Sequence, residues 1–326
     1  MSQKSSGIGG QAVMEGIMMR HKDKYAIAVR KPDQEIEVKV EDYKSVIPLE
    51  KLGKLPIFRG VFSFVDSLVI GTKCLMYSAQ FFEDEEEMAQ KKAMTEEERQ
   101  KQEKKDEKLY KVMMTVTMIF SICLSVGLFI LLPYFAASFL RTITDSDLLV
   151  TTAEAVLRIT IFMIYMVLIS KMDDIQRVFM YHGAEHKCIN CLEHGMDLNV
   201  ENVMKSSRLH KRCGTSFLLI VMVVSIIFFF FIRVESPLWR VVVRILLMPV
   251  VAGVAYEFIR LAGKSDNRLV CLLSKPGMAL QKMSTQEPTP DMVEVAIAAV
   301  EAVFDWKAYL EEMREEEASG IAENAR

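Results

Sequence analysis

The sequence predicts a mainly α, polytopic helical membrane protein with about four spans, a small N-terminal β-hairpin and cytoplasmic helices. The 326-residue chain is 51% apolar yet 25% charged, and its mean hydropathy is still +0.19. Its apolar residues must therefore be concentrated in segments. Several of these segments approach or exceed the ~20 residues that a bilayer core requires. Near the N-terminus, apolar and polar residues alternate on both sides of a turn, which is typical of a hairpin.

Four apolar runs are long enough to cross a membrane as helices. They cover residues 112–139, 153–170, 216–232 and 239–262. Pro133 is expected to kink or end the first run, because proline removes a helical hydrogen bond. The charges of the fourth run lie near its ends, where long side chains can reach the interface. Together these runs define a membrane domain over residues 112–262.

The distribution of Lys and Arg orients these spans. Basic residues are concentrated in the 171–215 loop, before the first span and after the fourth. Lys and Arg prefer the cytoplasmic side of a membrane. We therefore expect a multi-pass protein of the plasma membrane whose termini and 171–215 loop are cytoplasmic.

The segment before the membrane domain divides into three parts. Residues 1–56 contain a Gly-rich string, Gly9–Arg20, expected to form a turn-rich strand, and then the hairpin of 25–30 and 35–40. Ile57–Phe82 has apolar residues at helical spacing together with charges, which predicts an amphipathic helix on the membrane surface or against the bundle. A fifth span is the alternative. Residues 83–111 form a charged connector.

The C-terminal tail, residues 263–326, is expected to be cytoplasmic. Pro276-Gly277 predicts a turn within it. Apolar residues then recur at helical spacing from Met292 to Val303, and Asp291 is the expected cap of that helix.

Composition excludes several classes. A net charge of −3 excludes a histone-like nucleic-acid binder, so no nucleic-acid partner is expected. Six cysteines are too few for a disulfide framework. The first residues lack the apolar run of a secretory signal.

Four of the five histidines lie in the 171–215 loop. The string Tyr181–Lys187 reads H-x-x-E-H, which puts His182 and His186 on one face of a helix. Two imidazoles held in this way can bind one divalent metal ion, with zinc the first candidate. Glu185 could then act as the general base toward water that the metal acidifies to a pKa of roughly 7. This is the residue order of inverted zinc peptidases.

A metal site needs further ligands. His210 and Cys213 offer an imidazole and a thiol three residues apart, and Glu193 and His194 are the other candidates. Four protein ligands would close the site as in structural zinc centres, whereas three would leave a position for substrate. The sequence leaves both arrangements open.

Cys188 and Cys191 form a single C-x-x-C pair followed by a histidine. The spacing suits zinc or a redox pair, but without a second pair we favour two structural thiols. The histidines of the loop could also cap helices or contact the membrane surface.

Residues outside the motif can support the site. Glu15 could be a ligand, a carboxylate that orients a histidine, or half of an ion pair. Tyr181 and Lys187 could stabilise developing negative charge, and Arg208 is a further candidate for supporting the site or binding substrate.

Three strings together resemble the YqhQ-like family of bacterial membrane proteins. They are Gly9–Gly16 with Met18–Arg20, Tyr181–Lys187, and Ser207–His210 with Arg212–Phe217. The resemblance extends to Glu287-Pro288 and covers nearly the whole chain. It implies a bacterial plasma membrane and a multi-span helical fold. The family is of unknown function and generally described as predicted metal-dependent enzymes, so the resemblance implies no reaction.

Two functions fit these observations. One is a membrane-bound metal-dependent hydrolase at the cytoplasmic face, acting on a membrane-associated peptide or lipid. The alternative is a non-enzymatic scaffold, channel or transporter in which the His/Cys cluster is a structural metal site or polar network. Polar residues within spans, such as Arg244 and Glu257, would then mark a pathway. Membrane lipids are expected partners, and a homo-oligomer is compatible with the sequence.

Overall fold

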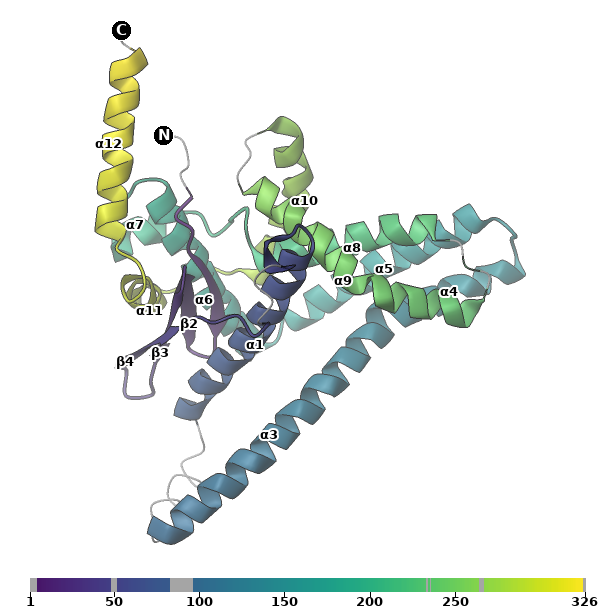
Figure 1. The fold of residues 1–326 in the computed structure, drawn as a ribbon, viewed down its shortest axis with the longest axis horizontal. Coiled ribbons are helices and arrows are strands. Elements are labelled where there is room, and N and C mark those ends of the chain that lie inside the picture. The colour runs from purple at the N-terminus through teal and green to yellow at the C-terminus, as the bar shows by residue number, and fades with distance from the viewer. Residues whose placement is uncertain are drawn as a thin grey trace. The chain divides into compact units, whose positions relative to one another are not determined.

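The computed structural model describes residues 5–47, 52–82, 96–232, 234, 236–263 and 267–324. Residues 83–95, the first part of the predicted charged connector, lie outside this range. The chain divides into two compact units, whose helices and strands are labelled in Figure 1. The first comprises Met1–Phe81, Leu168–Arg233 and Val242–Arg326, and the second comprises Phe82–Val167 and Val234–Val241. The expected class, a mainly helical membrane protein with a small N-terminal antiparallel β-structure, is confirmed.

The first unit begins with a four-stranded antiparallel sheet in the order β1-β2-β3-β4. The strands are β1 (Gly9–Val13), β2 (Gly16–His21), β3 (Lys24–Arg30) and β4 (Ile36–Asp42). β3 and β4 are the predicted hairpin. The Gly-rich string forms two strands where one was expected, because Glu15 takes a positive φ of 47° and closes a tight turn between β1 and β2.

The first unit also contains most of the described helices. After a short 3-10 turn (η1, Leu52–Lys54) they are α1 (Phe58–Ala79), α6 (Asp173–Glu193), α7 (Val200–Lys205), α8 (Gly214–Phe231), α10 (Arg268–Ser284), α11 (Pro290–Glu301) and α12 (Trp306–Asn324). A second 3-10 turn, η2 (Gln80–Phe82), follows α1, and most of α9 (Pro237–Ala262) also belongs to this unit.

The second unit contains α3 (Glu96–Val126), a π-helical turn η3 (Gly127–Leu131), α4 (Leu132–Ser138), the 3-10 turn η4 (Phe139–Thr142) and most of α5 (Asp147–Ile169). Pro133 stands at the start of α4, so the predicted interruption of this run takes the form of the π-helical turn before it. Arg158 pairs with Glu154 at 2.6 Å. It also donates to the carbonyl of Phe129 at 3.1 Å, within that turn.

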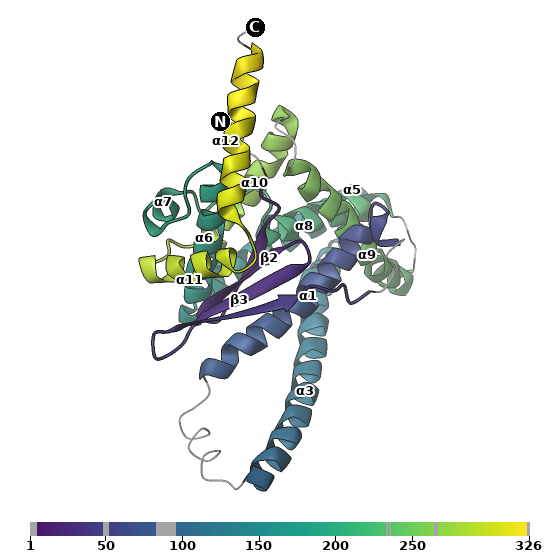
Figure 2. The same cartoon turned by 60° about the vertical axis from the view of Figure 1, so that its left-hand side comes forward.

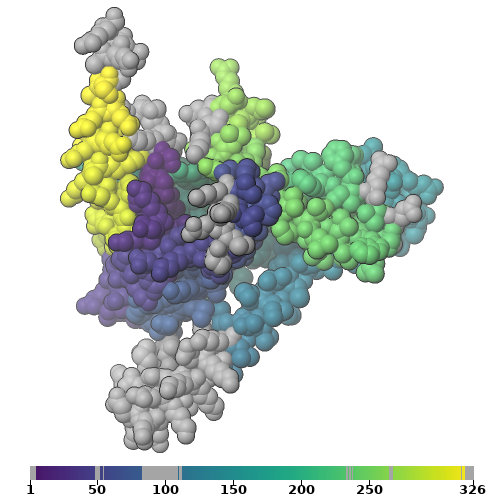
Figure 3. All heavy atoms as spheres, in the orientation of Figure 1, coloured from purple at the N-terminus to yellow at the C-terminus, as the bar shows by residue number. Residues whose placement is uncertain are grey.

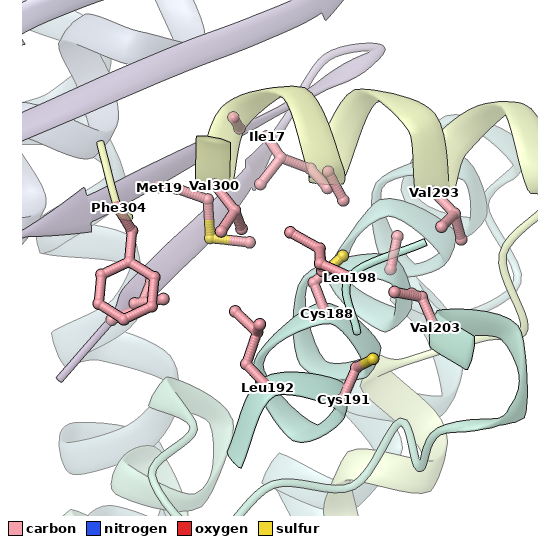
Figure 4. Packing of buried hydrophobic residues seen from close by; sticks show 14 of the residues in the cluster. Ile17, Met19, Cys188, Cys191, Leu192, Leu198, Val203, Val293, Val300 and Phe304 are labelled. Carbon is pink, nitrogen blue, oxygen red and sulfur yellow. The ribbon is translucent and has the colours of Figure 1, made fainter. Parts of the chain in front are cut away.

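The core of the first unit lies between the sheet and two helices. α11 contacts β2 and β3, and α6 contacts β1 and β2 (Figure 2). Ile17 and Met19 from β2 pack there with buried residues of α6 and α11, including Leu192 and Val300 (Figure 4). α1 also contacts the sheet, and the Met14 amide donates to the hydroxyl of Ser78 in α1. The core therefore fixes α6, which carries the H-x-x-E-H string, against the sheet.

Among the described residues, five helices are long and apolar enough to cross a membrane: Phe58–Phe82, Val112–Thr142, Asp147–Ile169, Gly214–Phe231 and Leu238–Ala262. The last four match the predicted runs. The first is the predicted amphipathic helix, which thus also meets the length and composition of a span. Its Arg59 pairs with Glu257 of α9, so Glu257 has an ion-pair partner in α1.

The C-terminal tail differs from expectation at Pro276-Gly277. These residues lie inside α10. Gly277 allows α10 to approach α8 closely, because a Cβ atom there would lie 2.8 Å from the Ser216 hydroxyl oxygen. The expected helix from Met292 is α11, and its N-cap is Thr289 in place of Asp291.

Candidate metal centre

The H-x-x-E-H string lies in the buried C-terminal half of α6. The helix begins with two acidic residues in its first turn, Asp173 and Asp174, which favour helix initiation by complementing the helix dipole. From residue 183 to residue 193 every residue of α6 is buried. Gly183 sits in this stretch where the backbone of Gln286 crosses the helix, so closely that a side chain at 183 would clash with the Gln286 carbonyl oxygen.

The structure brings together three of the four predicted metal ligands. Ligand atoms of His182, His186 and Cys213 all lie within 4.8 Å of one another. The Cys213 sulfur is 3.3 Å from His182 Nε2, and the ring centroids of the two histidines are 4.4 Å apart. His186 and Cys213 are buried, and His182 is partly exposed.

Backbone carbonyls orient both imidazoles. His182 Nδ1 lies 2.8 Å from the carbonyl oxygen of Ser284, and His186 Nδ1 lies 2.7 Å from that of Arg208. A carbonyl only accepts a hydrogen bond, so each Nδ1 carries the proton in the neutral ring. Each Nε2 then keeps its lone pair. In metalloproteins, a hydrogen bond from the non-ligating ring nitrogen to a carbonyl orients histidine ligands in the same way.

Cys213 enters the group from the N-terminus of α8. It is the N-cap residue of that helix, and its sulfur accepts a hydrogen bond from the Thr215 amide at 3.4 Å. The start of a helix favours a negatively charged group such as a thiolate.

The donor set fits zinc. Zinc bonds of about 2.0–2.1 Å to nitrogen and about 2.3 Å to sulfur, at tetrahedral angles, place N and S ligand atoms roughly 3.5 Å apart. The distance of 3.3 Å between His182 Nε2 and Cys213 Sγ is close to this value. Three protein ligands would leave a fourth position open, as in catalytic zinc sites.

Glu185 is buried beside this group. Burial raises the pKa of its carboxyl group, while the neighbouring His182 and a hydrogen bond from the Gly10 amide act in the opposite direction. Gly10 belongs to β1, and a Cβ atom there would lie 2.9 Å from the Glu185 carboxyl carbon. The glycine of the N-terminal string therefore lets the strand pass directly over the predicted general base.

The structure places the ring of His210 beside that of His186, with centroids 5.8 Å apart, but directs its Nε2 to another partner. Its Nε2 lies 3.2 Å from a carboxylate oxygen of Glu193, and it is not part of the three-residue group. Burial lowers the pKa of His210, so the neutral ring donates from Nε2. Glu193 also accepts from the amide and hydroxyl of Ser6 and pairs with Arg212. Burial raises the pKa of Glu193, but these bonds and the Arg212 charge outweigh it and lower the pKa to about 2.

Glu15 and Tyr181 lie together and interact with Arg177. Glu15 forms an ion pair with Arg177, and the Tyr181 hydroxyl donates to Glu15 at 3.3 Å. Burial raises the pKa of Tyr181. Of the roles considered for Glu15, the structure shows the ion pair.

Lys187 and Arg208 converge on the segment after α10. The Lys187 ammonium group donates to the carbonyls of Met204 and Ser206 at 2.8 and 2.9 Å and pairs with Glu287 at 2.9 Å. The Arg208 side chain donates to the carbonyl of Thr285 at 3.0 Å. Both cations thus hold the segment that directly follows Ser284, the residue whose carbonyl orients His182.

The C-x-x-C pair is part of the apolar core. Cys188 and Cys191 are both buried, and they lie among Leu192, Leu198 and Val203 (Figure 4). Burial raises the pKa of both thiols, that of Cys191 to about 11. His194 is exposed just after the last residue of α6, and its Nδ1 donates to the Asn190 carbonyl, 2.7 Å away. These positions match the structural-thiol interpretation.

Sequence reasoning missed the residues that orient the histidines. The Ser284 and Arg208 carbonyls are backbone groups, and no side-chain pattern reports them. Gly183 was a usable signal, because a glycine inside a buried helix often marks the close approach of another backbone. Gln281 is a second missed residue: its side-chain oxygen accepts from the His210 amide at 2.9 Å, and its amide donates to the His210 carbonyl at 2.7 Å.

Comparison with known proteins gives a family without an assigned activity. Residues 55–306 match the family model described as "Protein of unknown function (DUF1385)". The chain is 34% identical over 312 residues to "Uncharacterized protein YqhQ" of Bacillus subtilis (strain 168), covering 93% of this chain and 94% of that protein. No solved structure matches the chain.

Proposed function

The chain belongs to the DUF1385 family of proteins of unknown function, and we propose from its own residues that it is a membrane-bound metal-dependent hydrolase. The observation that carries this proposal is the meeting of His182, His186 and Cys213 within 4.8 Å. Because carbonyls accept the Nδ1 protons, both Nε2 lone pairs are free to bind one cation.

Zinc is the cation that this set of nitrogen and sulfur donors suits best. When bound, it would supply a Lewis acid that polarises the scissile carbonyl or phosphoryl group and acidifies water. The three side chains would hold the cation, and three protein ligands would leave one position for water or substrate. His210 is not required as a ligand in this arrangement.

Glu185 is proposed as the general base. It lies on the same turn of α6 as the two histidines, and the Gly10 amide fixes its carboxylate. From there it would accept the proton of the attacking water and return it to the leaving group. The proposed substrate is a membrane-associated peptide or lipid, met at the cytoplasmic face of a bacterial plasma membrane.

Metal content tests the centre itself. Elemental analysis of the detergent-purified protein should find one zinc per chain, and His182→Ala, His186→Ala and Cys213→Ala should each lose it. His194→Ala is the matched control, because this exposed histidine of the same helix lies outside the group. Full zinc content in the three ligand variants would refute the centre.

Turnover tests the general base. Fluorogenic peptides and labelled phospholipid vesicles would be offered to the purified protein with and without a chelator. Glu185→Gln should abolish any chelator-sensitive hydrolysis while zinc remains bound. Full activity of that variant would remove Glu185 from the mechanism.

The burial of His186 and Cys213 favours a second candidate, a structural zinc site in a non-enzymatic membrane protein. The cation would then join α6 to the start of α8. In that case chelation should lower the unfolding temperature sharply, and no substrate should be hydrolysed at a rate that Glu185→Gln changes.

A further inference from the structure

The helix α10 has its apolar and polar faces reversed relative to a helix in water. Its buried residues are mostly small or polar: Ser274, Gly277, Leu280, Gln281 and Ser284. Its large apolar residues point outward, with Leu269, Leu272 and Leu273 exposed by 63%, 57% and 53%. A helix surrounded by water places such leucines inward, so the outer surroundings of α10 are expected to be apolar.

Polar side chains on the buried face of α10 form hydrogen bonds with the beginning of α8. The Gln281 amide donates to the Ser216 hydroxyl at 2.7 Å, and the Ser284 hydroxyl donates to that of Thr215 at 3.0 Å. Gly277 brings the two backbones close together. Small and hydroxyl residues at a helix contact are typical of helices packed within or beside a membrane.

The position of α10 in the chain points to the membrane surface. Five residues separate α10 from α9, a candidate span that ends at Ala262. α10 also packs on the beginning of α8, another candidate span. One span therefore leaves the membrane, and the other enters it, beside α10. With 17 residues and several internal charges, α10 itself is unsuited to cross a bilayer. In Figure 3 the light-green spheres of this helix present an open outer side.

A row of cations borders the leucines. Arg268, Lys275 and Lys282 are exposed and spaced seven residues apart, which aligns them along one side of the helix next to the apolar stripe. A basic row beside an apolar stripe is the pattern of helices that lie in the interface of membranes with anionic lipids.

We propose that α10 is an interfacial helix that inserts Leu269, Leu272 and Leu273 into the headgroup region and binds anionic lipid through its basic row. Its last residue, Ser284, orients His182 through the carbonyl hydrogen bond, so α10 connects the bilayer surface to the candidate metal centre. If the protein is the proposed hydrolase, on which this step rests, the connection favours a lipid or a lipid-embedded segment as the substrate.

Tryptophan fluorescence tests the inserted face. In a Trp239→Phe/Trp306→Phe background of the full chain, Leu272→Trp would be reconstituted at low protein-to-lipid ratio into phosphatidylcholine vesicles, with and without phosphatidylglycerol. Its emission should be blue-shifted and quenched by brominated lipids. Ala308→Trp, exposed on α12, is the matched control and should show neither effect.

The basic row is tested in the same assay. Phosphatidylglycerol should increase the quenching of Leu272→Trp, and Arg268→Glu/Lys275→Glu should remove that increase. Water-like emission of Leu272→Trp would overturn the proposal. A blue shift without lipid quenching would also overturn it, because a protein surface such as a second copy would then cover α10. The assay uses metal-free protein, so its outcome is independent of the proposed hydrolase activity.

Discussion

The carbonyl oxygen of Gln286 lies against Gly183, in the place that a side chain at 183 would occupy. The Gln286 amide also donates to the Phe179 carbonyl of α6 at 2.9 Å. This contact fixes the segment after α10 on α6, and that segment directly follows Ser284, whose carbonyl accepts the hydrogen bond from His182. The glycine of the H-x-x-E-H string is thus part of the construction of the candidate centre.

Gly183→Ala should therefore weaken zinc binding. Alanine favours a helix over glycine by about 1 kcal/mol, but the clash is expected to cost about 1–3 kcal/mol and to displace the Ser284 carbonyl. Loss of such an outer hydrogen bond typically reduces metal affinity roughly 10–100-fold. Competition titration with a zinc indicator measures the change. Gly214→Ala is the control, since nothing lies within 4 Å of a Cβ there, and equal affinities for both variants would contradict the prediction.

Gly10→Ala should disturb Glu185 while leaving the zinc ligands in place. The new methyl group would meet the Met18 carbonyl at 2.8 Å and the Glu185 carboxyl carbon at 2.9 Å. We expect a loss of about 1–3 kcal/mol in unfolding free energy and reduced turnover at normal zinc content. Gly9→Ala, with open space around its Cβ, should stay within about 0.5 kcal/mol of the parent. Thermal unfolding in detergent and elemental analysis compare the two variants.

The cysteines should separate into two classes. Cys213→Ser should lose most of the bound zinc, because the thiolate is a far better ligand than a hydroxyl. Cys188→Ala and Cys191→Ala should keep zinc and lose about 1 kcal/mol of stability, as expected for small changes in a packed core. Zinc content and unfolding temperature are the measurements. Loss of zinc from Cys188→Ala would point instead to the C-x-x-C pair.

Glu193 should make the protein sensitive to acid. Its pKa falls from 4.5 to about 2 on folding, so the stabilisation is complete above pH 4.5 and is lost as the pH falls toward 2. The shift corresponds to about 3 kcal/mol at most. Glu193→Gln should flatten the loss of stability across this interval.

The control for this prediction is Glu201→Gln. Glu201 forms an exposed ion pair with Lys205 within α7, and screening by solvent keeps the contribution of such pairs to stability small. Unfolding measured from pH 6 downward should therefore give parallel curves for this variant and the parent. A Glu193→Gln curve that is also parallel to the parent would show that the buried network does not carry the acid sensitivity.

Much of the fold follows from local patterns. The four long apolar runs predict four of the five candidate spans, because length and hydropathy alone decide whether a helix can cross a bilayer. The alternation around Pro32 predicts the β3–β4 hairpin. The β1–β2 turn escaped prediction because it depends on a positive φ at Glu15, which non-glycine residues adopt only under the constraints of their surroundings. Pro276 suggested a turn, but packing against α8 keeps α10 continuous.

The candidate centre also depends partly on local sequence patterns and partly on the tertiary structure. The spacing of His182 and His186 puts two imidazoles on one helical face before any tertiary structure is considered, since that spacing matches the helical repeat. The choice of Cys213 over His210 belongs to the tertiary structure, because it depends on how α8 and Glu193 meet the buried end of α6 across long sequence separations. The carbonyls of Ser284 and Arg208 that orient the rings are backbone atoms, identical in every residue, and only the folded chain can bring them to the histidines.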